Sequence, residues 1–373
     1  MAHPGFFLAL EAAGTGAHPA SWRRADSRAE DLFTGRYWVE LIVAAEQAGL
    51  DAVFLPGAFE VRPGGPGGRL DAVAIAARVA AATHRIGLIP QAPVTHTEPF
   101  HVAKAIQSLD FATLGRAGWE VTVSEGDEQA RAFGRKPAQD AASLWHEADE
   151  AIEVVTRLWD SWEDDAEIRD APTGRFIDRD KLHYIDFTGD NFAVKGPSIT
   201  PRSPQGQPIV AVRADKSAAT EIALRRADLI RIGAPDLDAA RARRAELRSA
   251  LADVGRDPES VRILLDLDVH LADSADAAVT ELRTLDGWAA PIAAAPTALR
   301  HLGTTETLRE LLAAVHSAEA ADGVVLRPLA LPAVVRLLPA LDRKPQYSGT
   351  LRDRLGLARP ASRYAASTEG TPS

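Results

Sequence analysis

The chain has 373 residues, 46% of them hydrophobic and 25% charged, which is the composition of an ordinary globular protein and long enough for one large α/β barrel with insertions. Its net charge of −10 comes with no basic stripe, so a nucleic-acid partner is not expected, and the lack of cysteine excludes disulfides, thiolate metal sites and cysteine nucleophiles. The sequence starts without the features of a signal peptide and has no apolar run of transmembrane length, so we expect a cytoplasmic protein with no membrane partner.

Alternating strand and helix patterns predict the fold. Short apolar runs bounded by turn residues predict strands at residues 5–11, 51–55, 85–90, 118–124, 208–213, 227–233, 261–271 and 323–327. Runs with apolar residues at helical spacing predict helices at residues 36–48, 72–82, 100–109, 145–162, 218–227, 237–254, 305–318 and 332–341. This alternation implies a parallel sheet with helices packed on it. We therefore predict an α/β fold, a (β/α)8 TIM barrel in one domain (1–360), with insertions mostly after the fourth and seventh strands and a disordered tail (361–373).

Three polar segments have roles that the sequence leaves open. Residues 60–69 contain four glycines and two prolines at the end of a strand, which is typical of a lid over a barrel site or of a loop without a role. Residues 18–31 form either the mouth of a pocket or a surface loop. Residues 163–192 are acidic, but the spacing of Asp178, Asp180, His183 and Asp186 matches no metal motif, so no metal site is predicted.

The predicted strand 261–271 carries polar residues at every second position. Asp266, Asp268 and His270 alternate with apolar residues, so in a barrel strand all three share one face. They predict either a paired-carboxylate site or, more usually, internal hydrogen bonding or an exposed edge.

Segments spread along the chain resemble one family. They are HPASW at 18–22, ATHRIGL at 82–88, TEPFHVAKAIQSLD at 97–110, LGRAGWEVTVS at 114–124, ADEAIEVVTRLWDSWEDDA at 148–166 and ADGVVLRP at 321–328. These segments resemble the bacterial-luciferase-like flavin monooxygenases, most closely the branch of the nitrilotriacetate and dibenzothiophene-sulfone monooxygenases. The resemblance covers nearly the whole chain in the same order and implies a TIM barrel of the luciferase-like type.

The resemblance also implies a cofactor and partners. It implies FMN at the C-terminal face of the barrel, supplied in reduced form by a separate reductase, where the flavin reacts with oxygen to give a peroxyflavin that oxygenates a small organic substrate. The residues that correspond to cofactor positions of the family are Gln91, Glu120, Ser124 and Trp145 around the flavin, and Arg213, Lys216 and Ser217 at its phosphate. Because such proteins commonly form dimers, a homodimer or a heteromeric partner is implied as well.

Several of these positions depart from the family pattern. Gly57 stands where the family has an acidic residue, Glu120 replaces an asparagine, and Ala214 and Ala219 replace glycines of the phosphate turn. An ionised glutamate only accepts hydrogen bonds, and it repels an anionic reduced flavin. A Cβ is also unfavourable where the backbone must approach a phosphate closely. The turn at 213–217 is therefore either a phosphate site or a plain turn with exposed charges.

The sequence leaves three functions open. The first is an FMNH2-dependent monooxygenase, a flavoprotein oxidoreductase. The second is a non-catalytic or flavin-free paralogue on the same barrel, acting as a partner subunit or a ligand-binding protein. The third is an enzyme of another class in which Glu120 acts as the catalytic acid or base, with His96 or His101 nearby. Candidates for an apolar pocket wall are Trp22, Phe59 and Trp145.

Overall fold

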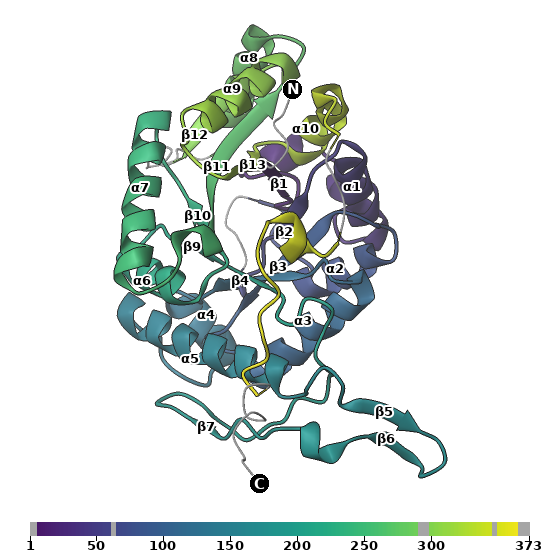
Figure 1. Ribbon diagram of the computed structural model, residues 1–373. Helices are drawn as coiled ribbons and strands as arrows, with labels where there is room; N and C mark the ends of the chain where they lie inside the picture. The colour runs from purple at the N-terminus through teal and green to yellow at the C-terminus, as the bar shows by residue number, and fades with distance from the viewer. Residues whose placement is uncertain (1–5, 61–64, 290–297, 345–348, 365–373) are drawn as a thin grey trace.

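Eight parallel strands close into a barrel in the computed structural model, which describes residues 6–60, 65–289, 298–344 and 349–364 (Figure 1). In their order around the barrel the strands are β1 (Phe7–Glu11), β2 (Ala52–Leu55), β3 (Gly87–Pro93), β4 (Gly118–Thr122), β9 (Ile209–Arg213), β10 (Leu229–Ile232), β11 (Arg262–Leu271) and β13 (Gly323–Pro328). Pairing of β1 with β13 and of β10 with β11 completes the circle. Each predicted strand overlaps one of these eight, so the predicted (β/α)8 TIM barrel is confirmed.

Helices surround the barrel and cover the outward faces of its strands (Figure 1). The helices that follow the barrel strands are α1 (Gly35–Gln47), α2 (Ala72–Ala80), α3 (Pro99–Thr113), α5 (Ala141–Asp160), α6 (Ser217–Arg226), α7 (Leu237–Asp253), α9 (Thr305–Ser317) and α10 (Leu331–Leu337). Their apolar stripes and the outward-facing strand residues form the larger buried cluster of the protein. None of the helices in the described part of the chain is long and apolar enough to cross a bilayer.

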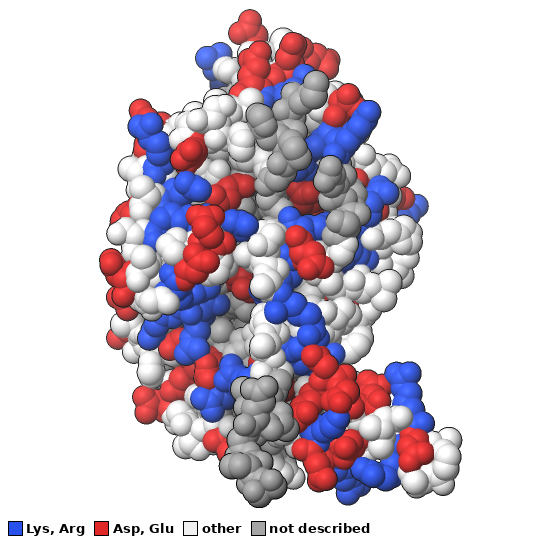
Figure 2. All heavy atoms as spheres, viewed as in Figure 1, with Lys and Arg blue, Asp and Glu red and all other residues white. Residues whose placement is uncertain are grey.

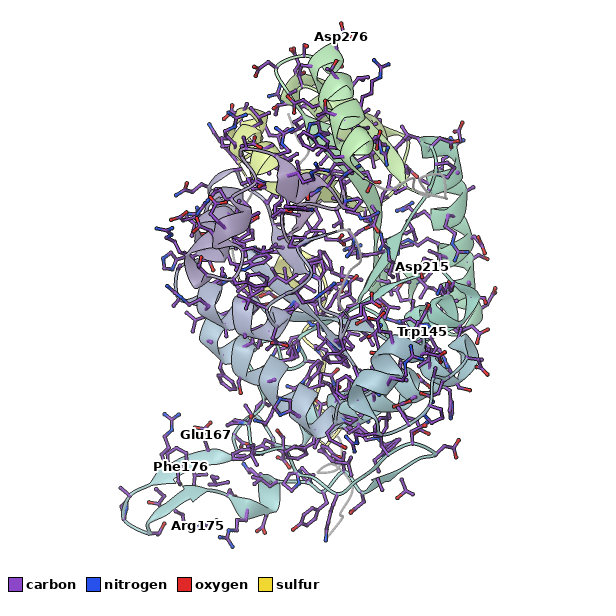
Figure 3. The ribbon with its side chains drawn as sticks, turned by 180° about the vertical axis from the view of Figure 1, so that it is seen from behind. Trp145, Glu167, Arg175, Phe176, Asp215 and Asp276 are labelled. Carbon is purple, nitrogen blue, oxygen red and sulfur yellow. The ribbon has the colours of Figure 1, made fainter. Side chains whose placement is uncertain are left out.

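The insertions lie after the fourth and seventh barrel strands, as predicted. After β4 come α4 (Asp127–Phe133) and two short hairpins, β5 (Glu167–Asp170) with β6 (Arg175–Ile177) and β7 (Phe187–Thr188) with β8 (Ala193–Val194). After β11 come α8 (Ala275–Trp288) and β12 (Leu299–Gly303). Figure 3 shows the labelled Glu167, Arg175 and Phe176 on a hairpin that projects away from the barrel, and Asp276 at the far tip of α8. Acidic and basic side chains are interspersed over the face seen in Figure 2.

Short elements complete the chain. They are α11 (Leu351–Arg354) and the 3-10 turns at Ser21–Arg23, Ala29–Asp31, Arg179–Lys181, Pro258–Ser260 and Leu338–Leu341. The predictions omitted α4, α8, α11 and β12, because these segments are short or mostly polar and their burial depends on the barrel beneath them. Residues 61–64, in the predicted lid, and 365–373, in the predicted tail, lie outside the described residues. Of the first tail residues, Arg363 pairs with Glu153 of α5 at 3.1 Å.

The C-terminal segment fills the N-terminal end of the barrel. Gly87, Gly118 and Gly323 begin β3, β4 and β13, so no side chains occupy this end of those strands. Leu351 of α11 takes the space, and a Cβ on Gly87 would lie 2.9 Å from its Cδ1. Apolar residues fill the middle of the barrel, and the smaller buried cluster joins them to the leucines of the C-terminal segment. The opposite end, where the strands finish, is the mouth on which polar side chains converge.

The mouth is widened on one side by β11. The first residues of this strand pair with β10 (Leu229↔Arg262 to Ile232↔Leu265), whereas its last residues pair with β12 (Leu267↔Leu299 to Leu271↔Gly303). Strand β12 therefore continues the barrel wall where β10 ends. It brings additional side chains to the mouth that an eight-stranded count does not include.

Candidate active site

A connected group of side chains crosses the barrel just below its mouth, with Arg231 of β10 at its centre. Its guanidinium donates hydrogen bonds to Glu11 at 2.6 Å, to Glu120 at 2.9 Å and to Asp266 at 2.9 Å. Its guanidinium carbon also lies 4.6 Å from the ring centroid of Phe54. Side chains from four other strands thus surround one fully buried cation. Its N–H donors are hydrogen-bonded to the three carboxylates.

The remaining strands extend this group to the barrel wall. Gln91 donates to Glu120 at 2.7 Å and accepts from the backbone N–H of Gly57 at 3.0 Å. Arg213 bonds to Asp266, and Arg327 donates to Glu11 at 3.3 Å. Each barrel strand thereby contributes one member of what we term the arginine–carboxylate layer: Glu11, Phe54, Gln91, Glu120, Arg213, Arg231, Asp266 and Arg327.

The layer holds its carboxylates at different proton affinities. Burial raises the pKa of Glu11, but the charges of Arg231 and Arg327 outweigh burial and bring that pKa to about 2. Burial instead dominates at Glu120 and raises its pKa, against the field of Arg231. Glu11 is therefore a fixed anion, and Glu120 is the member of the layer that takes up a proton more readily.

The alternating residues of β11 have partners inside the protein. Asp266 belongs to the layer, and Asp268 pairs with Arg327 at 3.2 Å and with Arg300 of β12 at 3.7 Å. His270 is buried and bonds to Glu281 of α8 at 2.8 Å. Of the alternatives for this strand, internal hydrogen bonding describes Asp266 and His270. Asp268 is held by ion pairs, and its Oδ1 has no hydrogen-bond partner among the described residues.

Three predicted site residues carry buried polar atoms without a partner: His96 after β3, Ser124 after β4 and Trp145 in the first turns of α5. The Ser124 hydroxyl, the Trp145 indole N–H and both ring nitrogens of His96 are buried and have no hydrogen-bond partner among the described residues. The His96 ring stacks on the ring of Phe133 of α4, with 4.6 Å between the ring centroids. Phe59 contacts the Phe133 ring edge-on, with 4.8 Å between the centroids. Such atoms are uncommon in folded proteins and indicate space for a polar ligand or for water.

His96 lies apart from Glu120. It lines a polar cavity of about 410 Å³ with Lys136 and Glu147, which pair with each other at 2.5 Å. Burial, followed by the charge of Lys136, lowers the pKa of His96. Within the described residues no hydrogen bond or ion pair joins His96 to Glu120, so the predicted catalytic pair does not form a direct contact, and the role of each residue stays a prediction.

The predicted phosphate residues lie where β9 leads into α6. Lys216 is the N-cap of α6 and gives no side-chain cap, and Ser217 is the first helical residue and is exposed. The first N–H groups of α6 therefore point outward without a side-chain acceptor, which is the arrangement that binds anions. Lys216 bonds to Glu125 at 2.6 Å, while Asp215 between the two cationic residues is exposed.

An apolar pocket of about 340 Å³ adjoins the ends of β1 and β2. Leu32, Trp38, Leu70 and Ile75 contribute to its walls. The residues expected to form an apolar wall, Trp22, Phe59 and Trp145, are not among those that line it in the described part of the chain.

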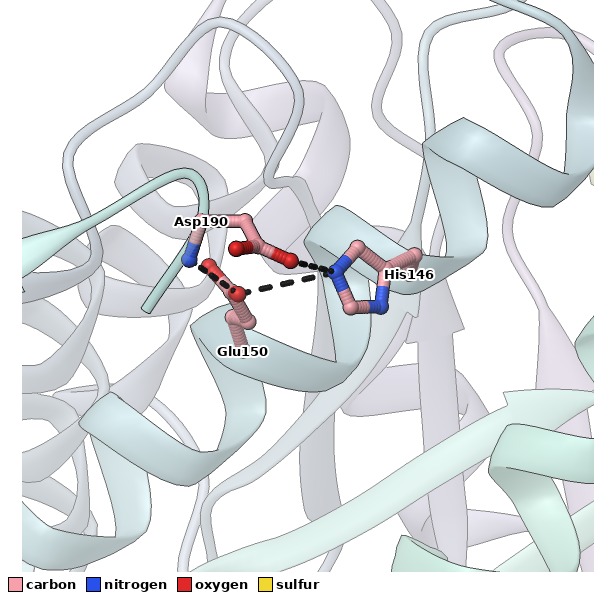
Figure 4. Close-up of side chains that lie close together, drawn as sticks. All are labelled: His146, Glu150 and Asp190. Atoms are coloured by element: carbon pink, nitrogen blue, oxygen red, sulfur yellow. Dashed lines mark hydrogen bonds and ion pairs between the residues drawn. The ribbon is translucent and has the colours of Figure 1, made fainter. Parts of the chain in front are cut away.

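A second polar cluster lies outside the barrel on α5 (Figure 4). The Nε2 atom of His146 lies 3.0 Å from Asp190 and 3.6 Å from Glu150. Glu150 also accepts the backbone N–H groups of Asp190 and Asn191 at 2.7 and 2.8 Å. These bonds fix the loop before β8 to the helix, which accounts for the cluster without a ligand. Of the residues considered for a metal in the sequence, His183 pairs instead with Glu163 at 2.8 Å.

Sequence reasoning missed the centre of the site. Neither Arg231 nor Glu11 nor Arg327 was singled out, although each is a charged residue inside or at the end of a short apolar run (LIRI, FLALE and GVVLRP). A single buried charge costs free energy unless it is paired. A charged residue in such a run therefore indicates that neighbouring strands carry residues of opposite charge.

Comparison with known proteins assigns the chain to a family. A family model described as luciferase-like monooxygenase matches residues 7–333. N-acetyl-S-(2-succino)cysteine monooxygenase of Bacillus subtilis is 33% identical over 76% of this chain and 65% of its own length. Nitrilotriacetate monooxygenase component A of Aminobacter aminovorans is 30% identical over 74% and 64%, and dibenzothiophene-sulfone monooxygenase of Rhodococcus erythropolis is 31% identical over 80% and 68%. The chain thus spans slightly less than two thirds of the length of the first two relatives.

Solved structures support the fold. The long-chain alkane monooxygenase structure aligns with a TM-score of 0.84 over 95% of this chain and 96% of its own, at 20% identity. The EDTA monooxygenase of Chelativorans sp. BNC1 aligns with a TM-score of 0.84 over 95% and 98%, at 22% identity. At these identities the likeness concerns the barrel and its insertions.

Proposed function

The chain belongs to the luciferase-like monooxygenase family, and on that premise we propose that it is a reduced-FMN-dependent monooxygenase that oxygenates a small organic molecule with O2. The observation that carries this proposal is the set of buried polar atoms without partners on His96 and Ser124, which follow β3 and β4, and on Trp145 of α5. By the resemblance, Ser124 and Trp145 correspond to cofactor positions of the family. These atoms have hydrogen-bonding capacity that the protein itself does not use.

The residues present fit FMN in part. Ser124 and Trp145 have free donors for the flavin, and the uncapped start of α6, with Lys216 and Ser217, suits its phosphate. Arg213, the third predicted phosphate residue, is paired instead with the buried Asp266 of the arginine–carboxylate layer and is left out of the proposed phosphate site. When bound, the flavin supplies the activation of O2 that no side chain provides.

Gln91 and Glu120 have a different role in this proposal. Their polar atoms are occupied by each other, by Arg231 and by Gly57, so they form the floor of the site instead of bonding to the flavin. The buried charges of the floor are fixed in place by the eight strands. A rigid floor positions a ligand above it and keeps water out of the barrel.

His96 is the proposed proton carrier. Its lowered pKa keeps the imidazole neutral near pH 7, so one ring nitrogen donates and the other accepts. Neither nitrogen is engaged by the protein, and Phe133 holds the ring in orientation. His96 is thus available to move a proton at a bound ligand.

The proposed partners follow from relatives. One relative is named as a component of a monooxygenase and another as one of the subunits of a synthase, so we propose a separate flavin reductase as the source of reduced FMN, and assembly as a homodimer or with a second chain. Relatives are named for substrates that range from nitrilotriacetate to long-chain alkanes, so membership of the family does not select the substrate class.

Equilibrium titration with FMN and, under anaerobic conditions, FMNH2 tests the proposal. We expect binding in the micromolar range or tighter, which corresponds to about −8 kcal/mol or better. The Lys216→Gln variant should bind FMN several-fold more weakly but bind riboflavin, which lacks the phosphate, unchanged. The matched control is Lys181→Gln, because Lys181, in the 3-10 turn that follows the β5–β6 hairpin, is also paired with one exposed carboxylate, Asp165. Absence of binding of both redox states at millimolar concentration would refute the proposal.

A further inference from the structure

The charged side chains near the mouth of the barrel differ in how deeply they are buried. The carboxylates of Glu120 and Asp266 are 1% and 0% exposed, whereas the side chains of Arg213, Arg300 and Arg327 are 33%, 32% and 20% exposed. A molecule entering the barrel mouth therefore meets these guanidinium groups before it meets the carboxylates of Glu120 and Asp266.

Two of these arginines form a row with one carboxylate. Arg300, Asp268 and Arg327 are register partners on the adjacent strands β12, β11 and β13. Register partners on parallel strands carry their side chains on the same face, so all three side chains face the mouth. The row is possible only because β12 extends the wall beside the end of β11. Arg213 lies on β9, across Arg231 from this row, and is joined to it through the arginine–carboxylate layer.

These arginines have N–H donors that make no hydrogen bond within the described residues. A guanidinium carries five N–H donors. Arg213 uses one of its terminal nitrogens for Asp266, and Arg300 lies 3.7 Å from Asp268, beyond ordinary hydrogen-bond length. Arg327 donates one hydrogen bond to Glu11 and lies 3.2 Å from Oδ1 of Asp268 in an ion pair. That Oδ1 has no hydrogen-bond partner among the described residues. The unspent donors suit the planar, two-oxygen geometry of a carboxylate.

The net charge of the group does not by itself attract an anion. The carboxylates of Glu11, Glu120, Asp266 and Asp268 equal in number the arginines at 213, 231, 300 and 327, so the group is neutral as a whole. A ligand carboxylate at the mouth would lie closer to the exposed guanidiniums than to the buried carboxylates. Its attraction to the site is therefore a short-range one that depends on direct contact with arginine.

We propose that Arg213, Arg300 and Arg327 bind the carboxylates of an anionic substrate at the barrel mouth, so that this protein acts on a carboxylate-bearing molecule and not on an apolar one. The identification of the anion as the substrate rests on the proposed function. The binding of the anion itself does not, because it needs neither flavin nor turnover.

Calorimetric titration of the full chain with propane-1,2,3-tricarboxylate tests this inference. The neutral control ligand is propane-1,2,3-tricarboxamide, which has the same carbon frame without charge. We expect the tricarboxylate to bind, the triamide to bind at least tenfold more weakly, and the affinity for the tricarboxylate to fall as salt is added. Equal affinities for the two ligands would overturn the inference.

Arginine variants test whether the tricarboxylate binds at the barrel mouth. Arg300→Gln should weaken binding of the tricarboxylate about tenfold, and it should leave folding intact because Arg300 has one long ion pair. Arg213→Gln is the second variant, since Asp266 retains Arg231 when Arg213 is lost. The control is Arg241→Gln, an exposed arginine paired with Asp238 on the outer helix α7. Thermal melts establish that each variant is folded, and unchanged binding in both mouth variants would contradict the inference.

Competition distinguishes a substrate site from the phosphate site of the cofactor. We expect the tricarboxylate to bind in the presence of saturating FMN and of inorganic phosphate. If either displaces it fully, these arginines belong to the cofactor phosphate and the inference fails. Tricarboxylate binding without any FMN binding would instead refute the proposed function and leave the anion site standing.

Discussion

Replacing Arg231 with methionine removes the cation that three buried carboxylates share. Methionine keeps an unbranched chain and leaves Phe54 an apolar neighbour, so the change concerns charge more than volume. Glu11, Glu120 and Asp266 each lose a hydrogen bond of 2.6 to 2.9 Å. Because water cannot reach these side chains, each must then find another cation, take up a proton or disrupt the barrel.

The expected loss of stability is about 3–5 kcal/mol near neutral pH, the usual effect of removing one partner of a buried ion pair. It should not be three times larger, because Arg213 still neutralises Asp266 and Arg327 still neutralises Glu11. Glu120 would keep only its hydrogen bond from Gln91. Of the three carboxylates, it is therefore the one that loss of the Arg231 charge affects most.

The sign of the pH dependence follows from the carboxyl groups. Burial already raises the pKa of Glu120 against the charge of Arg231, so loss of that charge raises this pKa further, and the folded variant binds more protons than the unfolded one. Stability then falls as pH rises, and the difference from the unmodified protein should be larger at about pH 8 than at about pH 5.

Urea unfolding at several pH values, followed by tryptophan fluorescence, measures this difference. The variant Arg231→Met/Glu120→Gln should recover part of the loss, because it removes the carboxylate that has no second arginine. The control Arg241→Met should change stability by less than about 0.5 kcal/mol, since that residue is exposed on α7. A loss that is the same at every pH, or no recovery in the double variant, would show that packing and not charge accounts for the role of Arg231.

Three further predictions concern other parts of the protein. Leu351→Ala should destabilise the fold by about 2–5 kcal/mol in urea, because Leu351 fills the N-terminal end of the barrel. Glu11→Gln should cost about 3 kcal/mol at neutral pH, because Glu11 has a pKa of about 2 against an ordinary 4.5; this stabilisation is complete above the ordinary pKa and is lost as pH falls towards 2, so the two proteins should converge there in acid unfolding. Lys136→Met should raise the pKa of His96 in an NMR titration, because the lysine charge lowers that pKa while Glu147 raises it; an unchanged or lower pKa would contradict this account.

Much of the barrel was predictable because its signals are local. Runs such as AVFL in β2 and IVAVR in β9 are short, contain β-branched residues and are bounded by turn residues, and helices such as α5 show their apolar period over many residues. By contrast, β12 reads LRHLG, with two charged or polar residues in five, and within the described residues it pairs with β11 alone. Nothing in such a segment distinguishes it from a loop until β11 is in place beside it.

The site was predictable residue by residue but not as an arrangement. Glu120, Gln91 and Arg213 were singled out as cofactor positions, yet their actual partners could not be known from spacing. Glu120 meets Arg231 across 111 positions of sequence, and Glu11 meets Arg231 across 220. Such contacts depend on how the strands are staggered around the barrel, which no local pattern records.

The sequence by itself determined the family, the order of strands and helices, and the places of the insertions, because apolar periodicity and turn residues act over a few positions at a time. Tertiary structure alone decided what the charged residues do. Closure of the barrel brought charged side chains from six strands into one connected group, and the low dielectric of that interior made their pairing obligatory. It also left Arg213, Arg300 and Arg327 at the mouth, where they are more exposed than the carboxylates that pair with them.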